Sequence, residues 1–163
     1  MKKWTIGLFL IAALSIGVVV FAQMTASDEF SAEHQWGFLQ SQDYAKTWHF
    51  IQDKPMGMYK GAEPHGAQLQ TFVNNIAFDA INAKNGEYPY GSIIVKENYS
   101  PEGMLGAVTV MQKIKGFNPD AGDWAWVKYK ADGEVLKAGK VDGCIGCHAA
   151  MAAQDYVWST TIK

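Results

Sequence analysis

The sequence has 163 residues, with 16 acidic against 14 basic side chains, a formal net charge of −2 and no arginine. Because it also lacks a basic cluster, we do not expect nucleic acid as a partner. The length suits one compact domain built around one hydrophobic core.

The N-terminus has the pattern of a secretory signal peptide. Two lysines precede a long apolar run that ends at Phe21, and the small residue Ala22 follows, which suits a signal peptidase. We therefore predict a signal peptide over residues 1–22, cleavage before Gln23 and a periplasmic or otherwise exported protein. The run is nearly long enough to span a bilayer, so an uncleaved membrane anchor is the alternative. Residues 23–163 then form the single domain.

Helix signals come early in this domain. Ser27, followed by two acidic residues, predicts a helix N-terminus, and apolar residues at helical spacing continue to about Asp43. Residues 47–64 are typical of a loop because proline and glycine punctuate them. A second, short helix is predicted to begin at Asn74 or Asn75 and to end at an Asn-Gly pair.

The rest of the domain has strand periodicity. Apolar and polar residues alternate, or β-branched residues gather, in five segments that we predict as strands: 67–73, 92–99, 106–115, 124–130 and 134–138. Short loops between consecutive strands favour antiparallel pairing. The sequence thus predicts an α+β fold, an antiparallel β-sheet flanked by helices.

Near the C-terminus, the segment DGCIGCH at residues 142–148 holds both cysteines of the chain. Its pattern, Cys144-x-x-Cys147-His148, is typical of c-type haem attachment. On a helical turn the two thiols share one face, where they can bond both vinyl groups of one porphyrin, and His148 can ligate the iron. We predict one covalent haem c on a final helix that continues to about Ala153.

Other interpretations of the two cysteines fit less well. A disulfide across so short a loop adds little stability. A redox dithiol does not need the histidine, and a zinc site needs four ligands, which no second cluster supplies. Export also agrees with haem c, because bacteria attach these haems outside the cytoplasm.

Three segments carry a resemblance to a known family: YGSIIVKENY at 90–99, FNPDAGDWAWVKY at 117–129 and CIGCH at 144–148. With them the chain, over roughly residues 64–157, resembles the cytochrome P-460 superfamily. The resemblance implies an exported, mono-haem, mainly antiparallel-β homodimer with its haem motif near the C-terminus. The superfamily includes cytochromes P-460 that oxidise hydroxylamine and cytochromes c′-beta that bind gases.

The resemblance also assigns roles to residues. Cys144 and Cys147 would be the thioether attachments, and His148 the proximal iron ligand. Lys96 matches the lysine that bonds to the porphyrin edge in hydroxylamine-oxidising members, and period two allows its side chain to face the haem. The alternative for Lys96 is an ordinary solvated strand lysine.

Position 108 departs from the hydroxylamine-oxidising pattern. As we align the chains, those members carry a glutamate over the distal face of the haem, where this sequence has Val108. A carboxylate can accept protons from hydroxylamine and valine cannot. We therefore expect Val108 to line an apolar distal pocket.

The sixth iron position decides between functions. Met56, Met58 and His65, all near the start of the predicted sheet, are candidates for a distal ligand, while Met111 is expected to pack elsewhere. A loop histidine that merely forms hydrogen bonds is the alternative for His65.

Three functions follow from these alternatives. An open apolar site predicts binding of small ligands such as NO or CO. A Lys96–haem bond predicts an oxidoreductase acting on hydroxylamine or nitric oxide, and methionine ligation predicts an electron-transfer cytochrome with a redox partner protein.

Overall fold

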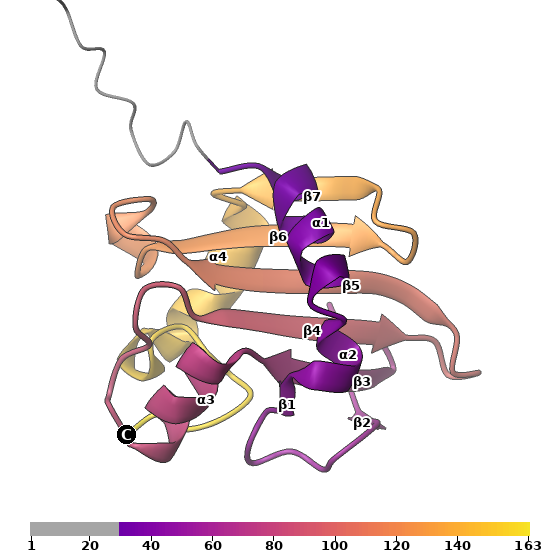
Figure 1. The fold of residues 1–163 in the computed structure, drawn as a ribbon, viewed down its shortest axis with the longest axis horizontal. Coiled ribbons are helices and arrows are strands. Elements are labelled where there is room, and N and C mark those ends of the chain that lie inside the picture. The colour runs from indigo at the N-terminus through magenta and orange to yellow at the C-terminus, as the bar shows by residue number, and fades with distance from the viewer. Residues whose placement is uncertain (1–29) are drawn as a thin grey trace, which may run out of the picture.

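The computed structural model describes residues 30–163 (Figure 1). The predicted signal peptide, its cleavage site before Gln23 and the predicted helix cap Ser27 lie outside these residues. No helix of the described part is both long and apolar enough to cross a bilayer.

Within residues 30–163, one sheet of seven antiparallel strands organises the fold, in the order β1-β3-β4-β5-β6-β7, with β2 also paired to β3. The strands are β1 His49–Phe50, β2 Tyr59–Lys60, β3 Gln68–Val73, β4 Ile93–Tyr99, β5 Leu105–Lys113, β6 Trp124–Lys130 and β7 Val135–Gly139. The helices are α1 Ala32–Ser41, α2 Tyr44–Thr47, α3 Asn75–Asn82 and α4 Asp142–His148, with 3₁₀ segments η1 Pro119–Ala121 and η2 Ala149–Gln154. The predicted α+β class is confirmed.

The five predicted strands are all present as β3 to β7. Their ends differ from the prediction by at most two residues, and β6 matches at both ends. The agreement has a physical basis, because β-branched and aromatic side chains at period two fit a pleated surface that is buried.

Helix boundaries were predicted less well. The first helix begins at Ala32, because Ser31 is extended and its hydroxyl accepts a hydrogen bond from the backbone N–H of His34 at 3.1 Å. Within the described residues the helix therefore begins at Ala32, and Ser31 rather than Ser27 is its cap. The predicted loop over 47–64 also contains the short strands β1 and β2.

The haem motif forms a shorter α-helix than predicted. α4 ends at His148, and the chain continues as the 3₁₀ segment η2. Met151 leaves the helical region, with φ −108° and ψ 21°, so the prediction of an α-helix to Ala153 is wrong. The tighter segment brings the C-terminal residues back toward the sheet.

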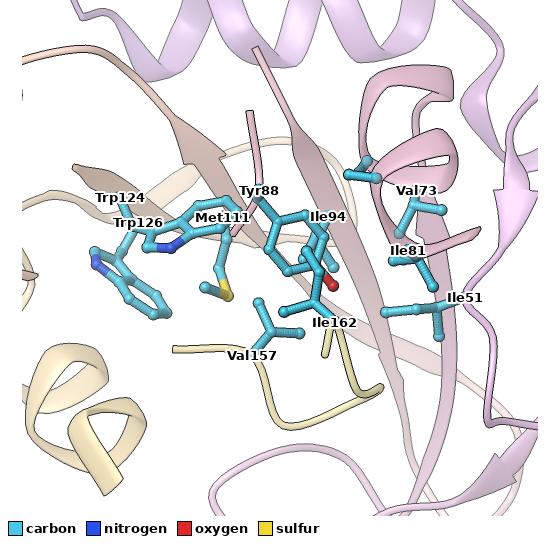
Figure 2. Close-up of a cluster of buried hydrophobic side chains, with 12 residues drawn as sticks. Ile51, Val73, Ile81, Tyr88, Ile94, Met111, Trp124, Trp126, Val157 and Ile162 are labelled. Carbon is cyan, nitrogen blue, oxygen red and sulfur yellow. The ribbon is translucent and has the colours of Figure 1, made fainter. Parts of the chain in front are cut away.

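The sheet buries both of its faces. α1 crosses one face (Figure 1), where the buried cluster is Ala32, Leu39, Tyr44, Phe72, Ile93, Val95, Val108, Val110, Val127 and Tyr129. The other face carries α3, α4 and the C-terminal segment. Figure 2 shows its cluster, which contains Ile51, Val73, Ala77, Ala80, Ile81, Tyr88, Ile94, Met111, Trp124, Trp126, Val157 and Ile162.

A buried ion pair ties the C-terminal segment to β5. The Nζ atom of Lys113 lies 2.6 Å and 2.7 Å from the two carboxylate oxygens of Asp155. Only 1% of the Lys113 side chain and 7% of the Asp155 side chain are exposed. The same carboxylate accepts the backbone N–H of Tyr88 at 2.8 Å, and Trp124 Nε1 donates to the carbonyl oxygen of Asp155 at 3.0 Å.

We predict that Asp155→Asn lowers the free energy of unfolding by about 3 kcal/mol, because it removes the buried counter-charge of Lys113 and leaves only the exposed Glu87 carboxylate, 3.2 Å away. Urea denaturation followed by circular dichroism measures the change. Glu134→Gln is the matched control, since it breaks the exposed Lys130–Glu134 pair, and it is expected to cost less than about 1 kcal/mol. Equal effects of the two substitutions would contradict the prediction.

Candidate functional site

A cavity of about 260 Å³ lies between the sheet and α4. Its wall is mostly apolar, with contributions from Ile94, Met111, Trp126, Val157 and Trp158. The residues Pro64 and His65, which precede β3, also line it, as do Gly143, Cys144, Cys147 and His148 of α4. Segments that are far apart in the sequence therefore meet at one concave site.

α4 brings two thiols and an imidazole to this cavity. Cys144 and Cys147 are three residues apart on one helix, and they form no disulfide. Burial raises the pKa of the Cys144 thiol. The imidazole of His148 is buried, and Trp126 packs edge-on against it with ring centroids 4.6 Å apart.

The orientation of His148 is fixed by a backbone carbonyl. Its Nδ1 lies 2.7 Å from the carbonyl oxygen of Tyr156. Because a carbonyl only accepts, Nδ1 carries the proton and Nε2 carries the lone pair. Burial also lowers the pKa of His148, which favours the neutral imidazole.

The carbonyl of Tyr156 is held by an unusual turn. Asp155 and Tyr156 both have left-handed backbone conformations, with φ of 53° and 66°. Such conformations are unfavourable for residues other than glycine and persist only when surrounding contacts hold them. Here the contacts are those of the buried Asp155 carboxylate with Lys113 and Tyr88.

A row of polar residues crosses the cavity floor. Lys96, Thr109, Lys128 and Lys137 are successive cross-strand partners on β4 to β7, and all four line the cavity. Lys128 and Lys137 are directly opposite each other, which is unfavourable for like charges. Desolvation, followed by the like charge of Lys54, lowers the pKa of Lys96 to about 8.

On another part of the wall, His65 faces His148. The two ring centroids are 6.4 Å apart and the ring planes are inclined by 80°. His65 Nδ1 lies 3.0 Å from Oδ1 of Asn98, a buried residue of β4. Burial, with the like charge of Lys96 second, lowers the pKa of His65 to about 4.

In a comparison with known families, residues 41–159 match the Cytochrome P460 model. The chain belongs to the cytochrome P460 family. It is therefore a c-type haem cytochrome, as the sequence resemblance implied. No curated protein matches the chain.

The residues at the cavity fit the haem group of this cytochrome P460 family member. The donor set is right, since two thiols and a neutral imidazole lie on one short helix beside an apolar cavity. The lysine row provides cations for the carboxylates of a porphyrin, which would also offset the like-charge pair on β6 and β7. Trp126 Nε1, another residue of the cavity wall, is buried without a partner in the described part of the chain, and so remains a donor for an anionic group.

The cytochrome P460 fold does not bring every predicted residue to the cavity. Lys96 lines it, as predicted from period two, and so does His65. Met56 and Met58 do not line it, and 84% and 44% of their surfaces are exposed. These positions give no support to methionine ligation from the loop.

Val108 lies on the opposite face of the sheet, in the cluster under α1, and does not line the cavity. The prediction that Val108 lines the distal pocket is therefore wrong, and the strand register explains why. Lys96 pairs with Thr109, so position 109 and not 108 shares its face. By the same parity Met111 lines the cavity, contrary to the expectation that it packs elsewhere.

Sequence reasoning missed Asn98 as a partner of His65, and it missed Lys128 and Lys137. A usable signal existed for Asn98, because it follows Lys96 by two residues on β4 and so shares its face. Lys128 and Lys137 join this face only through the cross-strand pairing of β5, β6 and β7. Nothing in the sequence gave the register itself, since it depends on how long the loops between strands are and how they turn.

Proposed function

We propose that this cytochrome P460 family member is exported as a homodimer, carries one covalent haem c in the cavity and binds small neutral ligands such as NO or CO at the iron. The observation that supports this most is the joint position of Cys144, Cys147 and His148 beside a mostly apolar wall. A redox partner protein that reduces the iron is part of the proposal.

The chain's own residues serve this function in distinct ways. The Tyr156 carbonyl holds His148 with its Nε2 lone pair free to bind a metal. Away from the lysine row, apolar side chains such as Ile94 and Val157 make the cavity unfavourable for water and anions, whereas neutral diatomic molecules enter such a site without losing strong hydration. When bound, the haem supplies an iron that binds such ligands.

Among the described residues that line the cavity there is no aspartate or glutamate. Hydroxylamine oxidation requires that protons be removed from the substrate, which a carboxylate would do. The lack of a carboxylate among these lining residues therefore favours ligand binding over hydroxylamine oxidation, independently of Val108.

One observation favours a second candidate function, an oxidoreductase acting on hydroxylamine or nitric oxide with a Lys96–haem bond. Lys96 lines the cavity, and its amine is less basic than an ordinary lysine. A larger fraction of the amine is therefore unprotonated and nucleophilic at neutral pH.

We expect the ferrous protein to bind CO and NO, with a shift of the Soret band on exposure to either gas. Titration of the reduced protein under each gas measures it by absorption spectroscopy. Azide, which is anionic, is the control and should bind the ferric protein weakly. Absence of any CO or NO complex would contradict the proposed ligand binding.

We expect one haem on the peptide that contains Cys144 and Cys147, and none cross-linked to Lys96. Mass spectrometry of a tryptic digest measures both linkages. Cys144→Ala with Cys147→Ala should abolish covalent haem, while Lys96→Ala should leave the haem mass and the spectrum unchanged. A haem-linked peptide containing Lys96 would instead support the oxidoreductase.

We expect the exported protein to begin at Gln23. Intact-mass measurement on the periplasmic fraction, after allowance for the haem, checks the N-terminus. A full-length chain in the membrane fraction would support the uncleaved anchor, and a full-length chain confined to the cytoplasm would contradict export.

A further inference from the structure

We propose that His65 is the second axial ligand of the haem iron, opposite His148, and that a gas binds only when His65 leaves. The inference rests on the proposed function in that it places the haem in this cavity. It adds to that function a residue that controls access to the iron.

The hydrogen bonds of Asn98 fix which nitrogen of His65 carries the proton. The amide nitrogen of Asn98 donates to the carbonyl oxygens of Lys96 at 2.8 Å and Ala107 at 3.3 Å, two groups that can only accept. Its Oδ1 accepts the backbone N–H of Gly66 at 3.2 Å. Because Oδ1 also faces His65 Nδ1, that nitrogen must donate.

Nε2 of His65 therefore carries a lone pair, as Nε2 of His148 does. Both Nδ1 atoms are occupied by a fixed acceptor, which is how ligating histidines are commonly oriented. A histidine whose Nε2 lacks a proton cannot donate a hydrogen bond to a bound diatomic ligand. The alternative role, a distal donor that stabilises bound gas, is thus disfavoured by the same contacts.

The separation of the two rings agrees with a shared metal ion. Metal–imidazole bonds are about 2 Å long, so two rings that bind one ion from opposite sides have centroids roughly 6 Å apart. The observed separation is 6.4 Å, with ring planes inclined by 80°. Two neutral, lone-pair-bearing imidazoles at this distance have no direct hydrogen bond to make with each other.

His65 is also held in place firmly enough to act as a ligand. A Cβ atom on the neighbouring Gly66 would lie only 2.6 Å from the backbone nitrogen of Tyr99, so the loop sits directly against β4. The Gly61 N–H donates to the Ala67 carbonyl at 2.8 Å and closes the loop at its base. Displacement of His65 by a gas must therefore break an iron bond while the loop stays docked, by rotation of the side chain.

The test uses the exported holoprotein and compares the wild type with His65→Ala. We expect the wild type to be low-spin and six-coordinate in ferric and ferrous states by absorption and electron paramagnetic resonance. His65→Ala should become high-spin, and added imidazole should restore the low-spin spectrum. His34→Ala, which alters an exposed histidine on α1, should leave the spectrum as in the wild type.

CO binding adds a kinetic readout. If His65 occupies the iron most of the time, apparent CO affinity is reduced by the fraction of open sites, so His65→Ala should bind CO about tenfold or more tightly. The association rate of the wild type should level off as CO concentration rises, because loss of His65 becomes limiting.

A five-coordinate wild type, or a His65→Ala protein that stays low-spin without imidazole, would overturn the inference. The wild-type spectrum keeps the test decisive even if the variant does not fold. If both proteins are spectrally as expected but neither binds CO or NO, His65 ligation stands and the proposed gas binding fails.

Discussion

The site of this cytochrome depends on one buried carboxylate. Asp155 neutralises Lys113 on the central strand β5 and accepts the backbone N–H of Tyr88, while its own carbonyl accepts a hydrogen bond from Trp124. These contacts stabilise two consecutive left-handed residues, which would otherwise be costly. The second of them, Tyr156, presents the carbonyl that fixes His148. An interaction in the hydrophobic core thereby sets the direction of the Nε2 lone pair of His148.

The two faces of the sheet carry different kinds of side chain. Under α1 the buried side chains are mostly apolar, and the buried polar groups there form hydrogen bonds such as that from Tyr129 to Gln35. The other face is apolar near α3 but carries lysines toward β7, where Lys128 opposes Lys137. That arrangement is unfavourable until an anionic group enters. A haem bound in this cavity, as proposed, would therefore stabilise the folded state as any tightly bound ligand does.

The cavity combines features that would separately indicate different functions. Its apolar wall suits neutral gases, the depressed pKa of Lys96 suits a nucleophile, and His65 suits a closed sixth position. These readings are not equivalent, because a bound histidine competes with a gas for one coordination site. A firm loop and a fixed tautomer favour a resting state in which the iron is protected, with ligand binding as a controlled event.

The sequence by itself determined what is local. The haem motif of Cys144, Cys147 and His148 can be recognised within one helical turn, and five of the strands can be predicted from residue patterns of period two. Period two shows which residues share a face, but it does not say which face meets the cofactor, because both faces of this sheet are buried. For that reason the sequence pattern places Val108 on the wrong side of the sheet and does not indicate Thr109. The strand register, the pairing of Lys113 with Asp155 and the approach of His65 to His148 could be seen only in the folded structure. The reason is that each of these contacts joins segments that are distant in the sequence and meet only when the chain folds.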